Sequence, residues 1–244
     1  MFAKKVSKRG GRDEAEKPFW ISFSDLMTAC MTLFLVVMAV TIVSLEKKYG
    51  TKEAQIRKDS IDQCFVQLDG QKKVLFPSVK IDHNSVDAIR IDLGSIVNFK
   101  TNDYRIDKAG KEFLRSYIPS VLETVKSSAC KMYFRRVVVE GYTDTDGDYL
   151  TNLDLSLKRS EEVVCTFSPK VESEFQLSQA TLNQIRDLFL VGGFSFNSFK
   201  PSKAENRVVV LKLEFWQVGE KDKFTLENPN RIDLSNKEFG SCLR

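Results

Sequence analysis

The longest apolar stretch of the chain lies near its N-terminus, at residues 26–45. It contains no Asp, Glu, Lys, Arg or His, and at about 1.5 Å per residue a helix of this length spans roughly 30 Å, the thickness of a bilayer hydrocarbon core. Phe19 and Trp20 precede it, and aromatic side chains are enriched at the membrane–water interface. The pattern therefore predicts one transmembrane helix at residues 19–45.

The flank before this helix is polar and basic. Residues 1–18 combine glycines with charges of both signs, a composition that predicts a disordered tail. Lysine and arginine outnumber aspartate and glutamate there, so the positive-inside rule places the tail in the cytoplasm. We therefore expect a single-pass protein whose C-terminal part is periplasmic or extracellular. A cleaved signal peptide or a lipoprotein signal at Cys30 fits less well, because the apolar run is long and mostly follows that cysteine.

Beyond the membrane, the hydrophobic period changes twice. Residues 46–78 are charged, with Ile61, Phe65 and Leu68 at helical spacing, and they predict a juxtamembrane helix or a partly ordered linker. From residue 79 to residue 93 the apolar positions alternate, which predicts a hairpin with its turn at residues 82–85.

Residues 79–216 predict one α+β domain. Helical spacing is found at residues 107–126, in spite of Pro119, and again from near Leu153. Strands are expected at residues 137–139, 188–191 and 208–215. This order predicts a small mixed sheet with helices on one face. Residues 217–244 have no clear period and predict a polar C-terminal tail.

Composition narrows the function classes. The chain is 42% hydrophobic and 29% charged, with a small net charge of +4, and no basic stripe interleaves with aromatic residues, so no nucleic-acid partner is expected. Two disulfides are possible in an oxidising compartment, with all three full pairings open, and buried free thiols are the alternative. The four cysteines beyond the membrane are Cys64, Cys130, Cys165 and Cys242.

A carboxylate and a guanidinium flank one predicted loop. Asp144 follows a strand, and Arg159 lies inside the next helix, so both can face one pocket. Such a pair suits a ligand with neighbouring ammonium and carboxylate groups, and the helix N-terminus favours the anionic end. A surface ion pair or a helix cap is the plainer interpretation of the same two residues.

The residues around this pair resemble the OmpA-like peptidoglycan-binding domain over roughly residues 85–216. The matching positions are Gly141-Tyr142-Thr143-Asp144, Asn152, Leu155-Ser156, Arg159, Val163 and Asn206-Arg207-Val208. The resemblance implies that Asp144 and Arg159 bind the free end of diaminopimelate in the stem peptide. It also implies that Asn152 orders the loop and that Thr143 and Leu155 belong to the same site. Ser160, Val208 and the long stretch 167–187 depart from the family pattern.

Asp25 is a carboxylate at the cytoplasmic end of the predicted span. Lipid disfavours its charged form, whereas a helix N-terminus favours it, and such a group can load and release a proton. The plainer interpretation is an interfacial aspartate that reaches water. Residues 19–28 resemble the ion-binding helix of MotB-type stator subunits, and the whole chain resembles the stator-like subunits of Zorya anti-phage systems. This implies a homodimer in a proton-driven motor of a bacterial inner membrane, with a MotA-like (ZorA-like) multi-span partner and a periplasmic C-terminal domain.

The remaining chemistry gives little support to catalysis. His83 is the only histidine and is expected in a turn, so no catalytic triad can form, and no enzyme activity, metal site or cofactor is expected. A flagellar stator subunit and a passive wall anchor remain the alternatives. The choice between proton and sodium also stays open.

Overall fold

The computed structural model describes residues 13–85, 87–94, 96–170, 173–197, 201–227 and 237–242. The chain divides into two compact units, Met1–Glu53 and Ala54–Arg244. The first helix, α1 (Asp13–Leu75), begins in the first unit and ends in the second. Residues 1–12 of the expected disordered tail lie outside the described residues, whereas residues 13–18 belong to α1.

The apolar part of α1 is long enough to cross a membrane. The candidate span begins at Phe23, and none of its most apolar stretch is buried by the rest of the chain. A helix that is apolar on all sides needs lipid or other helices around it. The expected transmembrane helix therefore falls on a segment whose surface requires such an environment.

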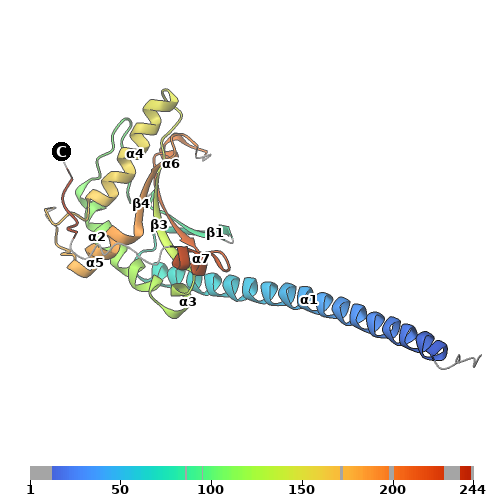
Figure 1. The fold of residues 1–244 in the computed structure, drawn as a ribbon. Coiled ribbons are helices and arrows are strands. Elements are labelled where there is room, and N and C mark those ends of the chain that lie inside the picture. The colour runs from blue at the N-terminus through green and yellow to red at the C-terminus, as the bar shows by residue number, and fades with distance from the viewer. Residues whose placement is uncertain are drawn as a thin grey trace, which may run out of the picture. The chain divides into compact units, whose positions relative to one another are not determined.

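The second unit is built on one five-stranded mixed sheet (Figure 1). The strand order is β1-β2-β5-β3-β4. β3 and β4 are parallel, and the other neighbours are antiparallel. The strands are β1 (Lys80–Ser85), β2 (Ala88–Asp92), β3 (Phe134–Gly141), β4 (Phe189–Gly193) and β5 (Val209–Phe215).

Three helices pack on one face of this sheet. They are α2 (Lys108–Val125), α4 (Tyr149–Cys165) and α5 (Gln179–Leu188). Alternate strand positions, such as Val137 of β3 and Leu213 of β5, are buried in the same hydrophobic core as these helices. The α+β class with helices on one face is confirmed. The described residues also form three short helices: α3 (Ser128–Lys131), α6 (Lys203–Asn206) and α7 (Glu220–Glu227).

Side-chain caps set the helix starts. Asp107 accepts a hydrogen bond from the Gly110 N–H at the start of α2, and Asp148 accepts one from the Thr151 N–H at the start of α4. The second cap explains why α4 begins before Leu153, where helical spacing first becomes clear. Pro119 lies inside α2 without ending it.

One local prediction was wrong, and one helix was missed. Residues 82–85 belong to β1 rather than to a turn, and the hairpin turns after Ser85. His83 is held in that strand because its ring stacks on Phe65 and its Nε2 lies 2.8 Å from Asp62 Oδ1. Helix α5 was not predicted at all, because its buried apolar positions are only Leu182 and Ile185.

The segment expected as a linker contributes to the core. Ile61, Cys64 and Leu68 of α1 are almost fully buried in the second unit. The cysteines form the pairs Cys64–Cys130 and Cys165–Cys242, while Cys30 is free. The second disulfide ties the C-terminal tail to the end of α4.

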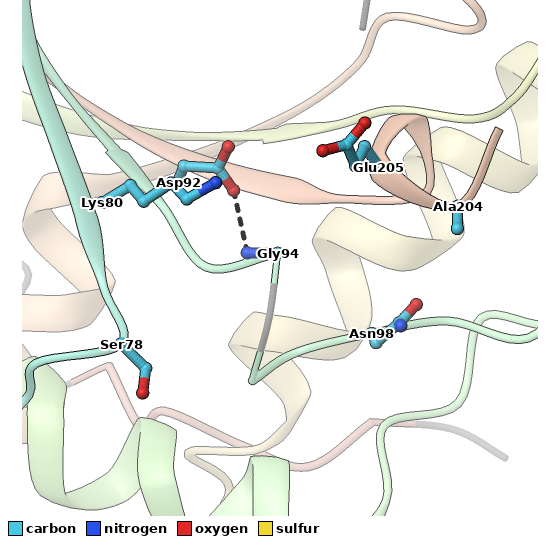
Figure 2. A pocket seen from close by; sticks show the side chains of 7 residues that line it. All are labelled: Ser78, Lys80, Asp92, Gly94, Asn98, Ala204 and Glu205. Atoms are coloured by element: carbon cyan, nitrogen blue, oxygen red, sulfur yellow. Dashed lines mark hydrogen bonds between the residues drawn. The ribbon is translucent and has the colours of Figure 1, made fainter. Parts of the chain in front are cut away.

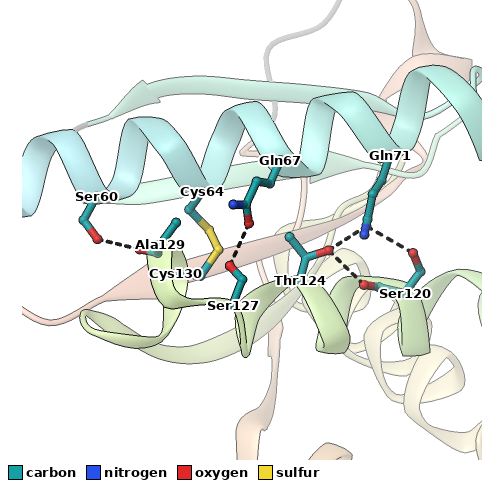
Figure 3. Close-up of a disulfide and its surroundings, with 9 residues drawn as sticks. All are labelled: Ser60, Cys64, Gln67, Gln71, Ser120, Thr124, Ser127, Ala129 and Cys130. Atoms are coloured by element: carbon teal, nitrogen blue, oxygen red, sulfur yellow. Dashed lines mark hydrogen bonds between the residues drawn. A yellow bond between two sulfur atoms is a disulfide. The ribbon is translucent and has the colours of Figure 1, made fainter.

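Polar side chains flank the first disulfide on both sides (Figure 3). Ser60 donates a hydrogen bond to the Ala129 carbonyl, and Ser127 donates one to Gln67 Oε1 at 2.7 Å. Further along, Thr124 donates to Gln71 Oε1 at 2.6 Å. From Cys64 to Gln71 the partner numbers fall from 130 through 127 to 124, so the end of α1 runs antiparallel to α2 and α3.

Candidate functional site

The expected binding residues gather at one end of the sheet, where β3 ends and β5 begins. Gly141 of β3 pairs with Val209 of β5 there. A side chain at residue 141 would meet the Ser156 carbonyl oxygen at 1.9 Å, so only glycine lets α4 approach the strand this closely. This contact places the segment after β3 against the first turns of α4.

Asp144 forms a nearly buried ion pair with Arg207. The Arg207 Nη1 donates to Asp144 Oδ2 at 2.9 Å, and the backbone N–H of Asp146 donates to Oδ1 at 3.2 Å. Burial acts to raise the pKa of Asp144, but these hydrogen bonds and the charges of Arg207 and Arg159 outweigh it and hold the pKa below its usual range. Asp144 is therefore an anion in a largely buried setting.

Arg159 lies close enough to this pair to feel the charges of both residues, and it is fully buried. Its guanidinium donates to three backbone carbonyls: Lys100 at 3.2 Å, Asp103 at 3.0 Å and Tyr142 at 2.9 Å. It also lies 5.0 Å from the centre of the Phe99 ring. Burial lowers the pKa of Arg159 to about 10, and Asp144 opposes this shift, so the side chain stays charged at neutral pH. Its position joins three chain segments around the site.

The loop after Asp144 is ordered by Asn152. The Asn152 amide donates to the carbonyls of Asp146 at 2.7 Å and Asp148 at 3.1 Å, while Gly147 has a φ of +92°, which favours glycine. Thr143 is buried, and its hydroxyl has no hydrogen-bond partner among the described residues. Leu155 is half-buried on α4.

The partner of Asp144 was not identified from the sequence. Arg207 lies two residues before β5, and its Nε also donates to the Phe99 carbonyl at 3.1 Å. The family resemblance did point to this residue, since Arg207 belongs to the quoted Asn206-Arg207-Val208 match. Nothing in the spacing, however, indicated that Arg207 rather than Arg159 makes the direct ion pair.

Asp25 belongs to the first unit, where its side chain is exposed on α1. Thr28 donates through its hydroxyl to the carbonyls of Ser24 and Asp25, so it satisfies its own polar atom within the helix. No acidic or basic side chain follows Asp25 until Glu46. Asp25 is thus the carboxylate that stands directly at the start of the uncharged stretch 26–45.

One further group has the donor types of a metal site. Glu161, Cys165 and Cys242 bring their ligand atoms within 4.8 Å of one another. The two sulfur atoms are joined in a disulfide, and metal ions bind thiolates. This cluster does not fit a resident metal.

Comparisons with known proteins address both units. Residues 3–54 match the MotB plug family, described as membrane MotB of the proton-channel complex MotA/MotB. Among solved structures, a putative MotB-like protein from Desulfovibrio vulgaris aligns with a TM-score of 0.46 at 14% identity, covering 67% of this chain and 96% of that one. The OmpA-like domain of FopA1 from Francisella tularensis aligns with a TM-score of 0.36 at 17% identity, covering 59% and 90%.

A curated relative matches almost the whole chain. The Zorya protein ZorB of Escherichia coli O139:H28 is 40% identical over 220 residues, which cover 88% of this chain and 87% of the relative. Identity at this level over most of the chain indicates common descent of the chain rather than of one shared module. The chain therefore belongs to the family of the Zorya protein ZorB.

Proposed function

We propose that this chain is the peptidoglycan-anchored subunit of a proton-driven MotA/MotB-like membrane motor that acts in anti-phage defence. The observation that carries the proposal is a single carboxylate, Asp25, at the start of an otherwise apolar helix in a ZorB-family chain. The N-terminal match to membrane MotB of a proton-channel complex supports it. The proposal includes a homodimer, a MotA-like multi-span partner and a cytoplasmic N-terminus.

Asp25 is the proposed ion carrier. An intramembrane carboxylate is costly unless it faces a partner or a water-filled path. Binding a proton neutralises it, and releasing the proton on the other side restores the charge. A passive wall anchor needs no such group in its membrane helix, so Asp25 favours the motor over the anchor.

The proposed wall-binding site lies where β3 ends and β5 begins. We call it the strand-end site, and it is centred on Asp144, Arg159 and Arg207. Asp144 would accept hydrogen bonds from the ammonium of a diaminopimelate end group. Arg159 was expected to bind the carboxylate end. Because its side chain is fully buried, we propose an indirect role for it instead. We propose that it supplies positive charge from below the pocket, while the more accessible Arg207 contacts the carboxylate directly. Asn152, Thr143 and Leu155 form the surrounding wall.

Asp25→Asn tests the motor. The amide is nearly isosteric but cannot carry a proton, so phage protection should be lost while membrane insertion and peptidoglycan binding stay at wild-type levels. Cys30→Ser is the matched control, because it changes a small side chain one turn further along the same helix without touching a titrating carboxylate. Full protection by Asp25→Asn would leave the passive anchor as the better explanation.

A further inference from the structure

A pocket of about 460 Å³ opens next to the strand-end site (Figure 2). Its walls come from the start of β1, the turn after β2 and the short helix α6. The polar side chains that line it include Lys80, Asp92, Asn98 and Glu205. Groups of both charge signs thus surround one volume, which suits a ligand with several polar groups better than a simple anion.

This pocket adjoins the Asp144 site through Arg207. Asp92 pairs with Val210 at the same end of the sheet where Gly141 pairs with Val209. Arg207 bonds to Asp144 and to the carbonyl of Phe99, while Glu205 and Asn98, neighbours of these residues in sequence, line the pocket. One ligand can therefore extend from Asp144 past Arg207 into the pocket.

A second pocket, of about 410 Å³, continues along the sheet face that the helices leave open. It shares Lys80 and Asp92 with the first and adds Arg90 and Tyr142. Because the two pockets share two lining residues, they form one groove, and Tyr142 places it beside the segment that leads to Thr143 and Asp144. We call this surface the Lys80 groove, defined by Lys80, Arg90, Asp92 and Glu205.

The charged side chains of the groove differ in whether they already have partners within the chain. Asp92 Oδ1 accepts from the Gly94 N–H at 2.8 Å, and Arg90 lies 2.6 Å from the buried Glu140. Lys80 is exposed, and no carboxylate among the described residues forms an ion pair with it. Its ammonium is therefore the cation of the groove that is available to an anionic group of a ligand.

We propose that the Lys80 groove binds the rest of the stem peptide whose end group occupies the Asp144 site, with Lys80 contacting a second, non-terminal carboxylate of that peptide. This inference rests on the proposed wall-binding function. It adds to it a preference between stem peptides whose non-terminal carboxylate is free and those in which it is amidated. A stem with a free carboxylate at this position binds more tightly than one in which it is amidated.

The test measures binding of soluble muropeptides to the full chain in detergent. Two muropeptides are compared that differ only in whether the non-terminal carboxylate is free or amidated, together with free diaminopimelate. The variants are Lys80→Ala, Asp144→Ala and the charge-matched control Lys126→Ala, which removes a partly exposed lysine paired with Glu123 on α2. Equal melting temperatures for wild type and Lys80→Ala exclude a folding effect.

Wild type and Lys126→Ala should bind the free-carboxylate form about two- to fivefold more tightly than the amidated form, the range of an exposed ion pair. Lys80→Ala should bind both forms alike and bind diaminopimelate as wild type does. If Lys80→Ala keeps the preference, or wild type has none, while Asp144→Ala still abolishes binding, the inference is overturned and the wall-binding function stands. If wild type binds none of the three ligands, both are overturned.

Discussion

Removing the Cys64–Cys130 disulfide should destabilise the second unit strongly. In the chain-entropy description, a bond that closes a loop over a sequence separation of 66 residues lowers the entropy of the unfolded chain by roughly 15 cal/mol/K, which corresponds to about 4 kcal/mol at 25 °C. Both sulfur atoms are buried, so Cys64→Ala with Cys130→Ala also leaves a small cavity. We therefore expect the free energy of unfolding to fall by at least this amount.

Urea unfolding of the full chain in detergent measures the change. Trp216 is a suitable fluorescent reporter, because its ring centre lies 4.2 Å from the Arg135 guanidinium and its backbone N–H donates to the Tyr133 carbonyl. A Trp20→Phe background in every sample removes the other tryptophan. A reductant breaks both disulfides and keeps all four sulfur atoms, so the cross-link is separated from the cavity by reducing wild type and a Cys165→Ala, Cys242→Ala variant side by side.

The matched control is Cys30→Ala, which removes the free cysteine of the first unit and should leave the transition unchanged. Since roughly 1 kcal/mol shifts the melting temperature of a domain of this size by 2–4 °C, the double variant should melt about 8–16 °C below wild type. A loss of less than about 1 kcal/mol relative to Cys30→Ala would refute the reasoning. It would mean that the unfolded chain is not constrained by the bond, or that the end of α1 is held equally well without it.

The remaining predictions concern the two proposed sites and the topology. Asp25→Glu should keep part of the phage protection that Asp25→Asn loses, because it can still titrate; equal loss in plaque assays would argue against proton carriage. Arg159→Lys should lower the free energy of unfolding by about 3 kcal/mol, because an ammonium cannot span three carbonyls, and a melting curve like that of wild type would contradict this. The depressed pKa of Asp144 contributes stability that is present above its unfolded pKa and lost as the pH falls through the folded one. The stability gap between wild type and Asp144→Asn should therefore begin to narrow as the pH falls below about 4, and a gap that stays constant as the pH is lowered further would contradict the assignment. A reporter fused after Arg244 should be active as a periplasmic enzyme and silent as a cytoplasmic one; the reverse would overturn the orientation.

Sequence patterns predicted the elements whose side chains meet a core at regular spacing. The helix at Lys108–Val125 and the strand at Val209–Phe215 fall close to the expected ranges, because their buried positions follow periods of 3.6 and 2. Helix α5 did not stand out, because only two of its residues are buried. Local pattern is informative only where one face is apolar enough to be recognised.

The site was predicted in composition but not in its connections. Asp144 and Arg159 do lie at one strand end, yet the ion pair of Asp144 is with Arg207, which is 63 residues further along the chain. The disulfide pairs likewise join residues separated by 66 and 77 positions. Such contacts depend on how the whole sheet is ordered, and neither spacing nor residue type contains that information.

The antiparallel seam between the end of α1 and the α2–α3 region has a mechanical consequence. A tension applied along the α1 axis would act on the contacts of Ser60, Cys64, Gln67 and Gln71 at the same time, as shear, instead of opening them one after another. Within that row the hydrogen bonds can exchange partners with water, whereas the sulfur–sulfur bond cannot. If the chain pulls against the cell wall, α1 could slide along α2 and α3 only as far as this covalent bond permits. The effective length of the tether would then be fixed at Cys64, and reducing conditions would lengthen it.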